Sequence, residues 1–142
     1  MKALCFGPLN IDFTYQVPRF VQPGESLVST GLQMFPGGKG LNQAIALARS
    51  GVETWIAGAI GPDGRFLMDT LNDAGVHTEL LMLQKEQHTG HAIIQCLPDG
   101  ENGILLHSGA NHCITVDMVV RALEGFGEGD LLVVQNEINA LP

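Results

Sequence analysis

Short apolar runs alternate with amphipathic helical segments along the first 75 residues, and this alternation restricts the fold more than any other feature of the sequence. Residues 3–6 (ALCF) and 54–60 (TWIAGAI) are continuous apolar runs, which are typical of strands buried on both faces. Residues 41–49 and 65–74 carry apolar side chains at helical spacing, and each segment ends close to a glycine. Strands that alternate with helices predict an α/β fold with a mostly parallel sheet.

A different pattern lies between the first strand and the first helix. Residues 11–17 alternate in part, and residues 25–30 and 32–35 read as two short strands joined near Gly31. None of these segments has a helical period. We therefore expect a small β flap that stands apart from the main sheet.

The last part of the chain continues with strand-like segments and ends in a further helix and strand. The strand-like segments are residues 79–83, 92–97 and 103–106, the last two joined by a hairpin-type turn at residues 98–102. Thr115 is suited to cap a helix that runs to about residue 125, with Asp117 in its first turn. Residues 130–134 are an apolar strand that normally feeds another crossover helix, so we expect this strand to have an unpaired edge and to favour association.

Charge and cysteine content exclude several classes of protein. The net charge is −8 and no basic run is present, which argues against nucleic acid or an anionic membrane surface as a partner. The three cysteines, Cys5, Cys96 and Cys113, are too far apart for a CxxC pair and odd in number, as expected of reduced thiols in the cytoplasm. His88 and His91 have no obvious third ligand, so we predict no metal site.

Residues 37–44 (GGKGLNQA) combine a glycine-rich turn, a helix N-terminus, a cation and a carboxamide. Glycines let a ligand approach the backbone, and the first N–H groups of a helix are free donors. Gly38, Lys39 and Asn42 are therefore candidate ligand-binding residues, although an isolated motif of this kind is more often an ordinary start of a helix. It is not a Walker P-loop, because Gln33 and Gly40 replace the required Gly and Ser or Thr.

Further polar residues follow two of the strands. Asn10 and Asp12 come just after the first strand, and Glu137 follows the last. Ligands of open α/β sheets bind outside the carboxyl ends of the strands, so these side chains are expected to meet the glycine turn at one edge of the sheet. Taken alone, an Asn and an Asp after a strand are more often turn formers.

Six segments in order resemble the ribokinase-like (PfkB-type) carbohydrate kinases, over essentially the whole chain. They are residues 7–12 (GPLNID), 37–44 (GGKGLNQA), 58–64 (GAIGPDG), 89–90 (TG), 99–102 (DGEN) and 109–111 (GAN). The resemblance implies a three-layer α/β sandwich with a β lid formed by segments near 11–17 and 25–35. It also implies that residues 1–142 are the N-terminal portion of such a kinase.

The resemblance implies that Asn10, Asp12, Gly38, Lys39, Asn42 and Glu137 bind the sugar. It favours ribose as the substrate and a homodimer formed through the lid. The DTxGAGD-like segment that supplies the family's catalytic base has no counterpart here, and the sites for ATP, Mg²⁺ and a monovalent cation are expected in the missing half. We therefore expect no catalytic residue in this chain and no kinase activity from it alone.

Two other interpretations stay open. The chain could be a binding or regulatory fragment that holds a sugar without phosphorylating it. An α/β oxidoreductase domain is less favoured, because the first strand leads into Gly7-Pro8-Leu9-Asn10 and not into a GxGxxG fingerprint.

Overall fold

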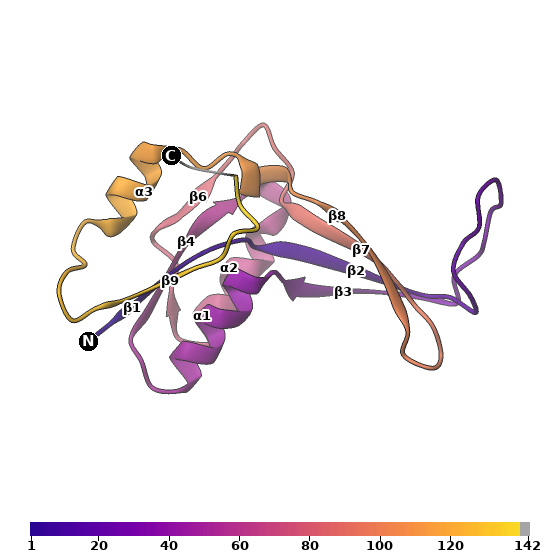
Figure 1. Cartoon of the computed structure of the whole chain (residues 1–142), viewed down its shortest axis with the longest axis horizontal. Coiled ribbons are helices and arrows are strands. Elements are labelled where there is room, and N and C mark those ends of the chain that lie inside the picture. Colours follow the sequence, from indigo (N-terminus) through magenta and orange to yellow (C-terminus); the bar gives the residue numbers. More distant parts are fainter. Residues whose placement is uncertain (140–142) are drawn as a thin grey trace.

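Within residues 1–139, which the computed structural model describes, the chain forms two β-sheets and three α-helices. Figure 1 shows the helices gathered around one sheet, while the second sheet projects away from them as a long arm. Below, the first is called the main sheet and the second the projecting sheet.

The main sheet is parallel throughout, and the two predicted apolar runs lie at its centre. β1 (Ala3–Phe6) pairs with β4 (Thr54–Ile60) on one side and with β9 (Leu131–Val134) on the other. β5 (Val76–His77), which was not predicted, lies beside the start of β4, and β6 (Leu81–Leu83) lies beside its end. The predicted mostly parallel sheet is confirmed.

Two of the predicted helices cover one face of the main sheet. α1 (Lys39–Arg49) begins two residues earlier than expected, and α2 (Arg65–Asp73) follows a short 3₁₀ turn, η1 (Pro62–Gly64). The core on this face is formed by buried apolar side chains from both helices and from the strands. They include Cys5, Ile56 and Ile60 from the strands, Leu41 and Ala44 from α1, and Leu67 and Leu71 from α2.

α3 (Val116–Leu123) lies on the opposite face, after a second 3₁₀ turn, η2 (Gly109–His112). Thr115 caps it as predicted, because its Oγ1 accepts a hydrogen bond of 3.3 Å from the Met118 N–H. The second core lies here and contains Leu4, Phe6, Ala57, Ala59, Ala110, Ile114 and Ala122. Alternate strand residues thus face opposite helix layers, which confirms the predicted three-layer α/β architecture.

The projecting sheet contains four strands in the order β3-β2-β7-β8. They are β2 (Asn10–Gln16), β3 (Gly31–Gly37), β7 (Gly90–Cys96) and β8 (Asn102–His107). The β flap expected from the sequence is therefore a separate sheet, but it is larger than expected. β7 and β8 form the predicted hairpin, and β7 pairs along the whole length of β2.

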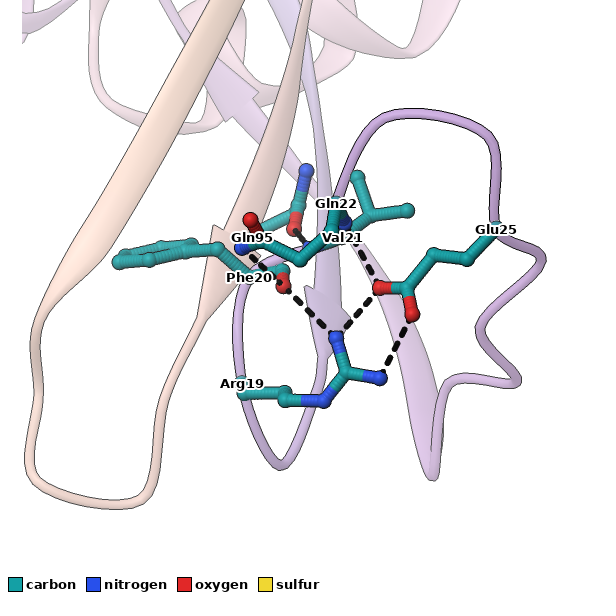
Figure 2. A network of polar contacts seen from close by, with 6 residues as sticks. All are labelled: Arg19, Phe20, Val21, Gln22, Glu25 and Gln95. Carbon is teal, nitrogen blue, oxygen red and sulfur yellow. Dashed lines mark hydrogen bonds and ion pairs between the residues drawn. The ribbon is translucent and has the colours of Figure 1, made fainter.

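The prediction of a strand at residues 25–30 was wrong. No strand forms there, and residues 17–30 are instead a long loop at the tip of the arm. Figure 2 shows how it is held: the Glu25 carboxylate accepts hydrogen bonds from the Arg19 guanidinium and, at 2.7 Å, from the Gln22 N–H. The Val21 N–H also donates to Gln95 Oε1 of β7, at 2.9 Å.

β9 is the outermost strand on its side of the main sheet. Within the described residues it pairs only with β1, and its side chains Leu131, Leu132 and Val134 are exposed. The expected unpaired edge is therefore present, while the association that we expect from it stays a prediction. None of the helices within residues 1–139 is both long and apolar enough to cross a bilayer.

Candidate functional site

The glycine turn packs against the segment that follows β1, with backbone against backbone. Gly38 has φ +95°, and a Cβ on it would lie 2.5 Å from the Pro8 carbonyl oxygen and 2.9 Å from the Asn10 nitrogen. A Cβ on Gly40 would lie 2.6 Å from the carbonyl carbon of Gly7, and the Gly40 N–H donates to Pro8 O at 3.1 Å. The motif therefore needs its glycines because α1 begins in direct contact with the end of β1.

Asn10 and Asp12 lie at the base of the projecting sheet and share one face of β2, two residues apart. Asn10 is buried opposite Gly37, and the Asp12 carboxylate lies directly over Gly37, where a Cβ would overlap it. Burial raises the pKa of Asp12, and within residues 1–139 no hydrogen bond or ion pair opposes that effect. Asp12 is therefore a half-buried hydrogen-bond acceptor without a donor among residues 1–139.

Lys39 and Glu137 form an ion pair that joins the start of α1 to the segment after β9. The two side chains are 58% and 40% exposed, so the pair contributes little to stability and its two groups stay available to a ligand. Glu137 reaches this position because β9 pairs with β1 in parallel and ends at the same edge.

Asn42 occupies a different position from the other candidates. It lies one turn into α1 with an exposed side chain, and its backbone N–H donates to Gly38 O at 3.0 Å. The hollow that it lines is shared with Pro36, Ile45, Arg49 and Thr70. The structure therefore brings Asn10, Asp12, Gly38, Lys39 and Glu137 to one edge of the main sheet but records no contact between the Asn42 side chain and that group.

Asn111 is a component of this site that the sequence analysis missed. It lies in η2, is 1% exposed, and its Oδ1 accepts from the Leu9 N–H at 3.0 Å. Its Nδ2 donates to Leu9 O at 3.1 Å and to Asn10 Oδ1 at 2.9 Å. Asn111 and Asn10 are 101 residues apart, and the GAN segment at residues 109–111 was the only signal that could have pointed to this contact.

A second polar cluster fixes the point where β7 leaves the body. Asp63 Oδ1 accepts from the Thr89 hydroxyl at 2.7 Å and from the Thr89 N–H at 2.9 Å, and the Gly61 N–H donates to Thr89 Oγ1. Burial alone would raise the pKa of Asp63, but the hydrogen bonds from Thr89 and His88 lower it below its ordinary value. Asp63 is therefore ionised and fully engaged in holding the projecting sheet.

A hollow larger than the one beside Asn42 lies elsewhere. It has a volume of about 510 Å³ between β6 and α3, and none of its lining residues belongs to the glycine turn or to β2. We place the candidate site at the glycine turn because polar groups from three strand ends converge there, whereas the larger hollow is lined mainly by the surface of one helix. No group of three or more His, Cys, Asp or Glu residues suited to a metal occurs among residues 1–139.

The whole chain, residues 1–142, matches the family described as pfkB family carbohydrate kinase. The ribokinase of Staphylococcus aureus is 36% identical over 140 residues, which are 96% of this chain and 46% of that protein. The ribokinase of Haemophilus influenzae is 37% identical over 134 residues, or 92% of this chain and 44% of that protein.

Solved structures agree with the sequence relatives. The ribokinase of Cryptococcus neoformans, solved in complex with ADP, is 42% identical, with a TM-score of 0.81 over 96% of this chain and 42% of that one. The Arabidopsis thaliana ribokinase, solved with ribose and ATP, is 29% identical, with a TM-score of 0.84 over 97% of this chain and 46% of that one. The chain thus spans slightly less than half the length of these relatives, and it belongs to the pfkB family of carbohydrate kinases, a family of phosphotransferases.

Proposed function

We propose that the chain forms the sugar-binding part of an ATP-dependent sugar kinase, with ribose as the favoured substrate. The observation that supports this proposal is the convergence of Asp12, Asn10 and the Lys39–Glu137 pair at the carboxyl edge of the main sheet, beside the glycine turn. Carboxylate, amide and ammonium groups within one small region are suited to a ligand with several hydroxyl groups, because each hydroxyl both donates and accepts.

Asp12 has the leading role in this proposal. Its carboxylate is half-buried, has no donor of its own among the described residues and carries a raised pKa, so a donated hydroxyl hydrogen is what it lacks. Lys39 would donate to a hydroxyl oxygen, and Glu137 would accept from a neighbouring hydroxyl once the ion pair opens. Gly38 would let the ligand approach the backbone, and Asn42 would reach the ligand from α1.

The projecting sheet is proposed to act as the lid over the sugar. Phe35, Ala92 and Leu106 lie on the same face as Asp12, since they are its neighbours in the register of β3, β7 and β8. An apolar surface beside Asp12 would cover the carbon skeleton of a sugar and exclude water from it. We assign the lid to the whole four-stranded sheet and not only to segments 11–17 and 25–35.

We also propose that two copies associate through their projecting sheets. Exposed apolar side chains lie on both faces of the arm, among them Phe35, Ile104 and Leu106 on the Asp12 face and Leu32, Met34 and Leu105 on the other. An exposed apolar surface of this kind is typical of an interface. Light scattering after size exclusion would show a dimer that L105D weakens, and a monomer at all concentrations would contradict the dimer.

ATP, Mg²⁺ and a monovalent cation belong to the activity of the family, and none of the residues described above forms a site for them. We propose that these sites, and the catalytic base, lie in the part of the relatives that this chain does not span. A cytoplasmic location fits such an ATP-dependent reaction. It also fits Cys5, whose pKa burial raises to about 11, so that its thiol stays protonated and unreactive.

Calorimetric titration with D-ribose tests the sugar site directly. We expect saturable binding to the 142-residue chain, and D12N should weaken it about tenfold or more because a hydrogen bond to a charged acceptor is lost. D69N, at an exposed position on α2, is the matched control and should bind as the wild type does. Absence of ribose binding would contradict the proposal for this chain.

A second candidate is a sugar-binding fragment without catalysis, favoured by the absence of a DTxGAGD-like segment from residues 1–142. The coding sequence beyond residue 142 separates the two candidates, because a downstream DTxGAGD-like segment would restore the kinase. An assay of ribose phosphorylation with ATP tests what the two candidates share. We expect no turnover by the 142-residue chain alone. Turnover would show that the catalytic base lies within this chain, against our proposal.

A further inference from the structure

The amide of Asn111 has only one orientation that satisfies its surroundings. It faces both the N–H and the C=O of Leu9, so its Oδ1 must accept from the first and its Nδ2 must donate to the second. A reversed amide would set oxygen against oxygen and nitrogen against nitrogen in a site that is 1% exposed, where unmatched polar groups are costly.

The orientation of Asn111 determines that of Asn10. The second hydrogen of Asn111 Nδ2 points at the Asn10 amide at 2.9 Å, so Asn10 must present its Oδ1 there. Within residues 1–139 every buried side-chain nitrogen or oxygen has a hydrogen-bond partner, while Nδ2 of Asn10 donates to none of them. Nδ2 of Asn10 must therefore reach solvent.

The strands on either side of Asn10 carry glycines where a Cβ would not fit. Gly90, which pairs with Asn10 in the ladder of β2 and β7, lies so close that a Cβ on it would overlap both Asn111 Nδ2 and Asn10 Oδ1. On the other side Asn10 pairs with Gly37, beneath the Asp12 carboxylate. Glycines therefore flank Asn10 on both neighbouring strands, and among residues 1–139 only Asn111 holds its side-chain amide by a hydrogen bond.

We propose that Asn111 is a positioning residue that turns Asn10 into a donor-only group, so that the site offers a ligand N–H donors at Asn10 and carboxylate acceptors at Asp12. This inference rests on the proposed sugar-binding function and specifies which hydrogen bonds the site can make to each hydroxyl of its ligand. A hydroxyl at Asn10 contributes its oxygen as an acceptor, whereas a hydroxyl at Asp12 contributes its hydrogen. A fluorine in place of a ligand hydroxyl can only accept a hydrogen bond, so it is tolerated beside Asn10 and not beside Asp12. An ammonium group can only donate hydrogen bonds, so it is rejected beside Asn10.

N10D separates this role from a merely structural one. The new carboxylate can still accept from Asn111, so the chain should stay folded, but it can no longer donate to a ligand. We expect ribose affinity to fall about tenfold or more at neutral pH, because two acceptors then face the sugar oxygen. N102D, on an exposed position of β8, introduces the same charge away from the site and should leave the affinity unchanged.

Lowering the pH should partly rescue N10D. A protonated carboxyl accepts through its C=O and donates through its O–H, as the amide does, and burial beside Asp12 raises the pKa of the introduced group above about 3.9. The other charged groups around the site are Asp12 itself and the Lys39–Glu137 pair, and all three are the same in the variant and in the wild type. The affinity ratio of variant to wild type at each pH therefore isolates the new group, and this ratio should approach one as the pH falls.

Two results would overturn the inference: N10D binding ribose as tightly as the wild type at neutral pH, or an affinity deficit that does not change with pH. A wild-type chain that binds no ribose contradicts the proposed function instead, and the amide orientation is then decided by NMR without ligand. Slow exchange of the Asn111 side-chain hydrogens in the wild type, together with a change in the chemical shifts of the Asn10 side-chain amide in N111S, supports the inference. Fast exchange in the wild type, or an Asn10 amide unaffected by N111S, overturns it.

Discussion

β1 in the main sheet and β8 in the projecting sheet are both short and rich in aliphatic residues, yet their surroundings differ completely. All four residues of β1 are buried, with helices against both of its faces, whereas every residue of β8 except Gly103 is exposed. Apolar sequence therefore has two different uses in this chain. In the main sheet it provides the core, and in the projecting sheet it provides a surface suited to a ligand or a second molecule.

The boundary between the two regions is narrow. Leu9 is buried in the main core, Asn10 is fixed by Asn111, and Asp12 is already half-buried at the base of the arm. Across these few residues the contacts change from apolar side chains to backbone and amide groups. We expect a substitution at the boundary to affect both regions, and a substitution beyond it to affect only the arm.

The largest effect is expected in the main sheet. I56A should lower the free energy of unfolding by about 2–5 kcal/mol, because Ile56 of β4 is 0% exposed and belongs to the core between the main sheet and helices α1 and α2. The same change at Ile104 of β8, which is 58% exposed, should lower it by less than about 0.5 kcal/mol. Urea denaturation of both variants measures the difference. Equal losses of unfolding free energy in the two variants would mean that the arm has a core of its own. The main sheet and the arm would then not differ in how their apolar residues are used.

A smaller effect is expected at the boundary, where G38A combines an unfavourable φ with a steric overlap. G100A is the matched control, since Gly38 and Gly100 have φ of +95° and +91° but only Gly38 has atoms within 4 Å of the added Cβ. Alanine at a positive φ costs at least about 1–2 kcal/mol in both variants. G38A should lose more than this because its Cβ meets Pro8 O, and it should also lose ribose binding. Equal destabilisation of the two variants would show that the contact is not tight.

The sequence predicts the main sheet well because burial on both faces leaves a direct signature in composition. Residues 3–6 and 54–60 could be identified from their apolar content alone, and Thr115 from its capping chemistry. Asn10 and Asp12 were candidates because they follow a strand at the carboxyl edge. These inferences depend only on neighbours in the chain.

The features that were missed depend on contacts between distant residues. β7 joins the projecting sheet by pairing with β2 about eighty residues earlier, and no local period specifies that partner. Residues 25–30 include Leu27 and Val28, which favour a strand, but the ladder of β2 and β3 ends at Gly31 and does not extend to them. The loop is instead held by the hydrogen bonds between Arg19 and Glu25, and Asn111 is held by its hydrogen bonds to Leu9. A sequence pattern predicts neither of these contacts.

The smallest effect is expected at the tip of the arm, where Glu25 makes the loop sensitive to acid. Hydrogen bonding to Arg19, together with the Gln22 N–H, lowers the pKa of Glu25 from 4.5 to about 2. Because the folded pKa is the lower one, the carboxylate stabilises the loop fully above the ordinary pKa. This contribution declines below it and is lost as the pH falls through about 2. The pair is exposed, so the contribution to global stability is small.

Amide exchange at Gln22 followed against pH measures this contribution, since its N–H donates to Glu25. In the wild type we expect protection to persist at mildly acidic pH and to fall as the pH approaches about 2, and E25Q should remove this step. E128Q, at an exposed position before β9, should leave it in place. The amides of Cys5 and Ile56 should be unaffected by E25Q, because the main sheet is stabilised by its core and not by the loop. If these amides lose protection together with Gln22, the arm and the main sheet unfold as one unit, and the independence of the two regions is refuted.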